Sequence, residues 1–133
     1  MLILVVEDEP FSALSAAWEL EHAGHEVLGP AASLDQALRL AAKHVPELAL
    51  IDIDLQHTGE GLALARRLQA SDIPTLFVSA EQTVASRHSD LALGYIGKPY
   101  NPADLAGSVD VIDALLHGRA PPDSTPRSLQ LFR

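Results

Sequence analysis

Four short apolar runs of the sequence each end in, or are followed by, side chains that can bind a cation or a phosphoryl group. In chain order these side chains are Glu7, Asp8 and Glu9, then Asp52 and Asp54, then Ser79, and finally Lys98. Carboxylates that converge repel one another unless a hard cation lies among them, and Mg²⁺ prefers oxygen ligands of this kind. Mg²⁺ also takes phosphate oxygens as ligands, so the set predicts a site for both a metal ion and a phosphoryl group.

Asp52, Ser79 and Lys98 have complementary uses at such a site. The carboxylate of Asp52 can act as a nucleophile and form an acyl phosphate. The hydroxyl of Ser79 can donate a hydrogen bond to a phosphoryl oxygen, and the ammonium of Lys98 can balance its charge. Taken singly, Ser79 is more typical of a helix cap, Lys98 of a solvated lysine, and the acidic run at 7–9 of a first helical turn. Their combination favours the chemical interpretation.

The apolar runs alternate with segments of helical periodicity, which indicates five βα units. Strands are expected at 2–6, 26–30, 48–52, 75–79 and 94–97, and helices at 10–23, 33–43, 60–70, 82–92 and 102–117. Strands that alternate with helices in this way form a parallel sheet covered on both faces, an α/β architecture. Ligands of such sheets bind in the crevice at the carboxyl ends of the strands, where the polar side chains are expected. Trp18, in the first helix, is expected to pack in the core or against another helix.

Helix signals are clear in most of these units. Ser33 and Gln36 predict a capping box, and Asn101 before Pro102 predicts an N-cap followed by proline at the first helical position. The segment 82–92 is the exception, since it has little apolar stripe and several poor helix formers. We therefore expect the fourth helix to be short or mobile.

The composition changes after Gly118. Residues 119–133 contain three prolines and show no period, which predicts a domain over 1–118 followed by a flexible tail over 119–133. The apolar residues Leu129, Leu131 and Phe132 leave open the alternative that the tail docks on a surface.

Charge and composition exclude several classes of protein. A formal net charge of −9 and a pI near 4.9 disfavour binding to nucleic acid, because the chain would repel phosphate backbones. The apolar stretch 1–6 has no basic residue ahead of it, unlike a secretion signal, and no apolar run is long enough to span a bilayer. The absence of cysteine fits a reducing cytosol. A cytoplasmic protein without membrane or nucleic-acid partners is expected.

Over about residues 1–117 the sequence resembles the receiver domains of bacterial two-component response regulators. The resemblance rests on the acidic pair Glu7-Asp8, on Asp52 at the end of the third strand, on Ser79-Ala80, and on Lys98-Pro99. It implies a flavodoxin-like, doubly wound sheet of five parallel strands in the order 2-1-3-4-5, with five flanking helices. It also implies that a sensor histidine kinase or a phosphotransfer protein donates the phosphoryl group.

The resemblance assigns a role to each residue of the set. Asp52 is implied as the phospho-acceptor, with Mg²⁺ bound by Asp8, Asp52, the backbone carbonyl of Asp54, and Glu7 through water. Ser79 and Lys98 are implied to bind the phosphoryl group, and Tyr95 with Ser79 to form the switch that reports it. The peptide bond before Pro99 is implied to be cis.

The sequence departs from the family pattern near Asp52 and after Ser79. Gln56 stands where the family often has proline, and the loop that contains it is one residue longer than is usual in the family. Ser79 and Tyr95 are 16 positions apart, a few fewer than usual, which agrees with a short fourth helix. His57 lies close enough in the sequence to modulate hydrolysis of the acyl phosphate.

Two other functions remain open at this stage. Asp52 and Asp54 together spell the DxD of a phosphohydrolase of the haloacid-dehalogenase type, in which one carboxylate attacks phosphate and the other handles protons. A pseudo-receiver would instead fold alike, stay unphosphorylated and serve as a binding module. For the receiver interpretation, output through a downstream protein, a homodimer or a phosphate sink is expected, with no enzymatic turnover beyond the chain's own phosphorylation and dephosphorylation.

Overall fold

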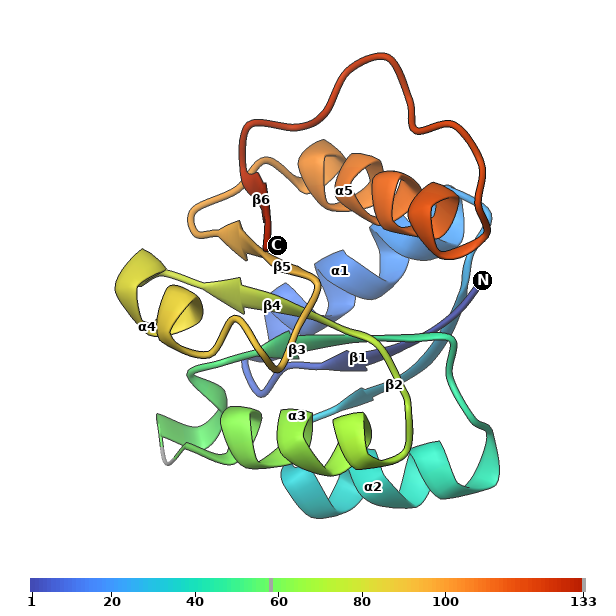
Figure 1. Cartoon of the computed structure of the whole chain (residues 1–133). Helices are drawn as coiled ribbons and strands as arrows, with labels where there is room; N and C mark the ends of the chain where they lie inside the picture. The colour runs from blue at the N-terminus through green and yellow to red at the C-terminus, as the bar shows by residue number, and fades with distance from the viewer. Residues whose placement is uncertain (58, 133) are drawn as a thin grey trace.

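The computed structural model describes residues 1–57 and 59–132, apart from the side chain of His57, so the hypothesis on that histidine lies outside the described residues. These residues form six strands, five α-helices and a short 3-10 helix, η1 (Figure 1). The strands are β1 (Leu2–Val6), β2 (Glu26–Ala31), β3 (Leu48–Asp52), β4 (Thr75–Ser79), β5 (Gly94–Gly97) and β6 (Leu129–Leu131). The helices are α1 (Pro10–His22), α2 (Leu34–Lys43), η1 (Leu55–His57), α3 (Glu60–Ala70), α4 (Gln82–Arg87) and α5 (Pro102–Leu116).

The strands build one sheet in the order β2-β1-β3-β4-β5-β6, and β1 to β5 are parallel in the predicted order. Helices α1 and α5 cover one face of the sheet, and α2 and α3 cover the other (Figure 1). Every residue of β3 and β4 is buried, because both of their faces meet helices. The carboxyl ends of β1, β3, β4 and β5 therefore lie at one edge of a rigid support.

The sheet has one strand more than the five predicted. Strand β6 pairs antiparallel with β5 and occupies the edge that β5 would otherwise leave open. Its three residues lie in the segment from which a tail was predicted, and three residues are too few to show the alternation that marks a strand. An open strand edge offers unpaired N–H and C=O groups, and this tertiary opportunity cannot be detected in the local sequence. The boundary at residue 118 stays a prediction.

Helices α4 and α5 match their sequence signals. Helix α4 has only six residues, as the weak pattern of that segment predicted. The side chain of Asn101 accepts a hydrogen bond from the Ala103 N–H at 3.0 Å and caps α5. Ser33 likewise accepts from the Gln36 N–H at 3.2 Å and caps α2. No helix among the described residues combines the length and apolar character needed to cross a membrane.

The expectation for Trp18 is wrong. Its side chain is 60% exposed on α1 and stacks on His22, with ring centroids 4.6 Å apart. The buried face of α1 consists of Leu20 and three alanines. The small alanine side chains let the helix lie close to the sheet, and Phe11, Leu14 and Trp18 are on the outer face.

Candidate functional site

Three carboxylates meet at the carboxyl edge of the sheet. Glu7 and Asp8 follow β1, and Asp52 ends β3, next to β1 in the sheet. One carboxylate oxygen from each of the three lies within 4.8 Å of the others. Glu7 and Asp52 are buried, at 8% and 5% exposure. The predicted convergence of these residues is therefore present in the fold.

Lys98 supplies the positive charge at this cluster. Its Nζ lies 2.9 Å from Asp52 Oδ2 and 3.9 Å from Glu7 Oε1. Burial by itself lowers the pKa of the ammonium, but the hydrogen bond to Asp52 and the charges of Asp52, Glu7 and Asp54 raise the pKa of Lys98 above its usual value. Lys98 is consequently held in its charged form against the carboxylate that it contacts.

The pKa of Glu7 indicates that the ammonium of Lys98 alone does not neutralise the negative charge of the cluster. Burial, a hydrogen bond with Asp52 and repulsion from the Asp52 charge raise the pKa of Glu7 to about 7, against an opposing effect of Lys98. A carboxyl group that retains its proton near neutrality marks a place where further positive charge would be accommodated. Three oxygen-bearing side chains at an edge open to solvent are a donor set that suits a hard divalent cation such as Mg²⁺.

The second oxygen of Asp52 is also occupied. Asp52 Oδ1 accepts a hydrogen bond from the backbone N–H of Asp54 at 2.9 Å, while Oδ2 contacts Lys98. These contacts fix the orientation of the carboxylate at the end of β3. The side chain of Asp54 is half-buried and is not one of the three carboxylates in the cluster.

Ser79 is close to Lys98 through the backbone, but its hydroxyl is directed elsewhere. The Ser79 carbonyl accepts a hydrogen bond from the Lys98 N–H at 2.8 Å. Its Oγ accepts from the Glu81 N–H at 3.0 Å and donates to the Glu81 carbonyl at 3.1 Å. The serine is 1% exposed. In this structure Ser79 thus closes a local turn after β4, and contact with a group on Asp52 would require it to rotate.

Gln56 and Gly61 belong to the site and were not assigned a role from the sequence. The backbone N–H of Gln56 donates to Asp8 Oδ2 at 3.2 Å, and its Nε2 donates to the Ala32 carbonyl at 2.6 Å. A Cβ at Gly61 would come within 2.5 Å of the Asp52 carbonyl oxygen, so α3 can approach β3 only because this residue lacks a side chain. Only the absence of proline at position 56 could have pointed to the contact of Gln56 with Asp8, because proline has no N–H to donate.

Tyr95 and Pro99 lie on either side of Lys98 along the chain. The Tyr95 ring is 7% exposed and packs against Phe132, with centroids 5.7 Å apart. The peptide bond between Lys98 and Pro99 is cis, as the resemblance implied, and the Gly29–Pro30 bond is cis as well.

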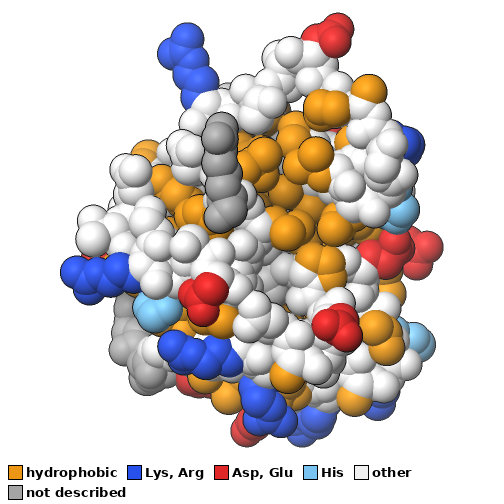
Figure 2. Space-filling model, viewed as in Figure 1, with side chains coloured by type: hydrophobic (Ala, Val, Ile, Leu, Met, Phe, Trp, Pro, Cys, Tyr) orange, Lys and Arg blue, Asp and Glu red, His pale blue; other side chains and the backbone are white. Residues whose placement is uncertain are grey.

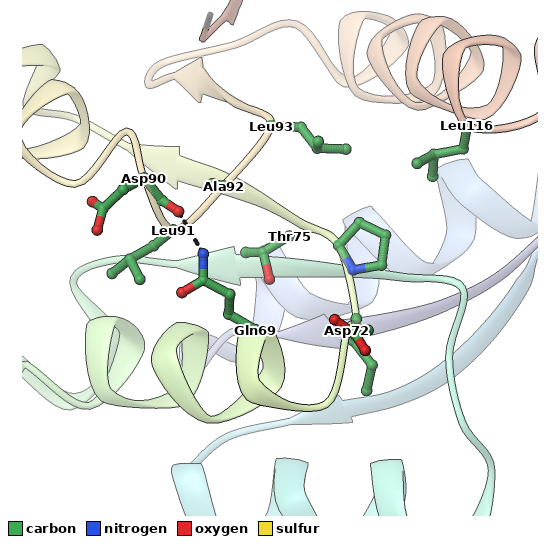
Figure 3. Close-up of a pocket in the computed structure, with 10 residues that line it drawn as sticks. Gln69, Asp72, Thr75, Asp90, Leu91, Ala92, Leu93 and Leu116 are labelled. Carbon is green, nitrogen blue, oxygen red and sulfur yellow. Dashed lines mark hydrogen bonds between the residues drawn. The ribbon is translucent and has the colours of Figure 1, made fainter.

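Two surface pockets differ in their relation to the carboxylates. One, of about 510 Å³, is lined by residues of α1 and by the segment that follows β5, including Phe11, Lys98, Pro99 and Tyr100. It therefore opens beside the site. The other, of about 370 Å³, lies around Thr75 at the opposite end of β4 (Figure 3). Figure 2 shows hydrophobic side chains gathered on that face, but the pocket is remote from Asp52.

Comparison with known proteins agrees with this geometry. The sequence profile of the response regulator receiver domain matches residues 3–110. The phyllosphere-induced regulator PhyR of Methylorubrum extorquens is 32% identical over an alignment of 111 residues, and the match covers 80% of this chain and 41% of PhyR. The transcriptional regulatory protein PdtaR of Mycobacterium tuberculosis is 26% identical, over 82% of this chain and 55% of its own. The chain thus spans about half the length of these curated relatives.

A solved structure has the same fold. The signal receiver domain of a modulated diguanylate cyclase from Desulfovibrio desulfuricans superposes with a TM-score of 0.74 at 30% identity, covering 88% of this chain and 94% of that one. The parallel sheet with an acidic cluster at its carboxyl edge is the architecture of a signalling module. The chain belongs to the response regulator receiver domain family of two-component signalling.

Proposed function

We propose that Asp52 accepts a phosphoryl group from the phosphohistidine of a sensor histidine kinase or a phosphotransfer protein. The observation that carries this proposal is the environment of Asp52, a buried carboxylate that contacts Lys98 at 2.9 Å and lies within the cluster of Glu7 and Asp8. In the transfer, an Asp52 oxygen forms a bond to phosphorus while the bond between phosphorus and the histidine nitrogen breaks, and that nitrogen keeps the electron pair.

Mg²⁺ is proposed as the cofactor of this step. Asp8 and Asp52 would bind it directly, Glu7 would bind it through water, and the carbonyl of Asp54 would complete the protein ligands. The raised pKa of Glu7 supports this assignment, because burial first and the neighbouring Asp52 second disfavour its ionised form, and a bound cation would favour that form. When bound, the ion would offset charge on the phosphoryl oxygens during transfer.

Ser79, Lys98 and Tyr95 are proposed to bind and report the phosphoryl group. Lys98 needs only a small shift from Asp52 to pair with a phosphoryl oxygen. The hydroxyl of Ser79 would leave Glu81 and donate to another of these oxygens. Because β4 and β5 are adjacent and Ser79 is paired with Gly97, a shift of Ser79 would displace β5, the strand that carries Tyr95.

A protein donor is supported by the surface beside the site. Phe11, Leu14 and Trp18 are 81%, 65% and 60% exposed on α1, and the pocket that contains Phe11 also contains Lys98. An exposed apolar row beside a reactive carboxylate suits a partner that covers the site and excludes water during transfer. The acidic net charge argues against a nucleic-acid partner, and a cytoplasmic location remains a prediction.

The test is labelling of the full chain by acetyl phosphate, followed by intact mass measurement. One phosphoryl group per chain is expected, dependent on Mg²⁺ and lost in Asp52→Asn. Asp54→Asn is the matched control and should still be labelled, since its proposed role uses only the backbone carbonyl. Absence of labelling in the unmodified chain would refute the proposal in favour of a pseudo-receiver. Sustained hydrolysis of phosphate esters that requires Asp54 would instead support a phosphohydrolase.

A further inference from the structure

The segment Pro126–Phe132, called the strap from here on, covers the whole outer edge of β5. At one end the Gly97 N–H donates to the Ser128 carbonyl at 2.9 Å, and at the other the Phe132 N–H donates to the Leu93 carbonyl at 2.9 Å. Between them the antiparallel register of β6 runs along the strand. Figure 1 shows the chain leaving α5, looping away from the domain and returning beside β5. The strap therefore occupies an edge at which another strand could pair.

Two glycines leave room for the strap. A Cβ at Gly94 would collide with the backbone carbonyl oxygen of Gln130, and a Cβ at Gly107 would come within 3.0 Å of Pro126 Cγ. Gly94 belongs to β5 and Gly107 to α5, so two separate elements lack a side chain where the strap passes. The match indicates that the strap is a fitted part of the fold.

Side chains anchor the strap on both faces of the sheet. Leu129 is 7% exposed and packs in the core beneath α1 and α5. On the opposite face, the Phe132 ring lies against Tyr95. Ser128 Oγ donates to Asp104 Oδ2 of α5 at 3.0 Å. The anchors are few, and a three-residue strand at a sheet edge is at the low end of local stability, so the strap is suited to reversible release.

The strap is connected to the phosphoryl site through a short covalent path. Its bond to the sheet at Gly97 lies one residue before Lys98, whose ammonium contacts Asp52. The Lys98 N–H is itself bonded to the Ser79 carbonyl. A phosphoryl group on Asp52 would place its oxygens beyond the carboxylate and draw the Lys98 ammonium outward. Ser79 would turn toward the same group, and because its carbonyl accepts from the Lys98 N–H, the two movements together would displace the backbone at Gly97 and Lys98 and strain or break the bond from Gly97 to the strap.

We propose that the strap is docked while Asp52 is unmodified and is released on phosphorylation, which uncovers the edge of β5 for an extended strand of a partner protein. Such a strand would pair antiparallel with β5, with an apolar residue in place of Leu129 and an aromatic residue against Tyr95. Linkage requires the reverse effect also, so that release of the strap favours phosphorylation. The trigger rests on the proposed function of Asp52, whereas the docking of the strap does not.

The first test is amide hydrogen exchange of the full chain with and without acetyl phosphate and Mg²⁺. The amides of Gly97 and Phe132 should exchange at least about tenfold faster in the phosphorylated chain, whereas that of Leu50 in β3 should not change. The mass of the same sample reports labelling. A labelled chain with unchanged exchange at both strap amides overturns the inference and leaves the proposed function intact. An unlabelled chain contradicts the proposed function instead.

The second test releases the strap without phosphorylation. Gly107→Ala should favour the helix but place a Cβ 3.0 Å from Pro126 Cγ, a crowded contact that pushes the strap outward and should accelerate exchange at Gly97 and Phe132 by several-fold. Adding Pro126→Ala, which removes the colliding Cγ, should restore slow exchange. Unchanged exchange in Gly107→Ala would show that the strap is not held there and would overturn its fitted docking.

The third test concerns linkage and the partner strand. Phe132→Ala should raise the rate of labelling by acetyl phosphate about fivefold, and Leu131→Ala, which alters a half-exposed residue of the same strand, should leave it unchanged. A synthetic peptide with the sequence of residues 126–132 should bind the Phe132→Ala chain more tightly than the unmodified chain. Equal labelling rates in the two variants, or no preference of the peptide, would overturn the proposal.

Discussion

At the scale of single residues, the raised pKa of Glu7 is the clearest electrostatic property of the site. The cluster contains three carboxylates, and the ammonium of Lys98 is engaged by Asp52. The folded chain therefore binds a proton at Glu7 more tightly than the unfolded chain, because its pKa rises from 4.5 to about 7. The stability contributed by this proton is fully present below pH 4.5 and is lost as the pH rises through about 7. A bound cation would take the place of that proton.

The affinity for Mg²⁺ should consequently fall as the pH drops below about 7, by up to about tenfold per pH unit, because the ion must displace the Glu7 proton. Isothermal titration calorimetry at a series of pH values measures this slope. Glu7→Gln removes the titrating group and should flatten the dependence, whereas Glu9→Gln, on the adjacent helix cap, should not. An equally steep slope in Glu7→Gln would assign the proton to another residue.

The sequence could predict where the residues of the site lie, but not which hydrogen bonds their side chains and backbone make. Glu7, Asp8, Asp52 and Lys98 follow parallel strands, and strand order alone brings them to one edge. The rotation of the Ser79 hydroxyl toward Glu81 is a local choice between hydrogen-bond partners that residue type does not determine. The backbone contact between Gln56 and Asp8 was hard to predict for a similar reason, because any residue except proline could supply that N–H.

Helix α1 shows at the scale of elements how two apolar faces of one helix differ. Leu20 is completely buried, while Trp18 is 60% exposed and contacts His22. Leu20→Ala should lower the free energy of unfolding by about 2–5 kcal/mol, through lost burial and an internal cavity. Trp18→Ala should change it by no more than about 0.5 kcal/mol, as expected for an exposed site. Urea unfolding of both variants measures the difference, and a large loss in Trp18→Ala would contradict the orientation of α1.

Helix α5 starts at Pro102, four residues after Lys98, and depends on its cap. Asn101 accepts the Ala103 N–H at 3.0 Å, and this bond satisfies one donor of the first turn. Asn101→Ala should lower the free energy of unfolding by about 1 kcal/mol, whereas Asn101→Asp keeps an acceptor and should lose much less. Chemical denaturation compares the two variants, and equal losses would indicate that the cap bond contributes little.

The elements that could be predicted are those with long, periodic patterns. Strands β1 to β5 and their helices were predicted in the correct order along the chain, because each apolar run is followed by a helical segment. Strand β6 and the exposure of Trp18 were not. Both depend on what the rest of the fold leaves available, an open edge beside β5 in the first case and an alanine-rich inner face of α1 in the second.

At the scale of the whole molecule, the rigid sheet concentrates negative charge at one edge. Every residue of β3 and four of the five residues of β1 are buried, so the strand ends at Asp52 and before Glu7 and Asp8 cannot easily move apart to relieve repulsion. The chain as a whole also has a net charge of −9. Without a cation, repulsion among these carboxylates therefore destabilises the folded state. Binding of a cation should raise the free energy of unfolding of the whole chain.

Mg²⁺ should raise the free energy of unfolding by about 2.7 kcal/mol when its free concentration is about 100 times its dissociation constant. The gain arises because the folded chain assembles the three carboxylates that the unfolded chain holds apart. Thermal or urea unfolding with and without the ion, at constant ionic strength, measures it. Asp8→Asn removes a proposed direct ligand and should lose most of the gain, whereas Asp72→Asn, between α3 and the amino end of β4, should keep it. Equal gains in the two variants would mean that the ion acts on the diffuse charge of the chain and not at the edge of the sheet.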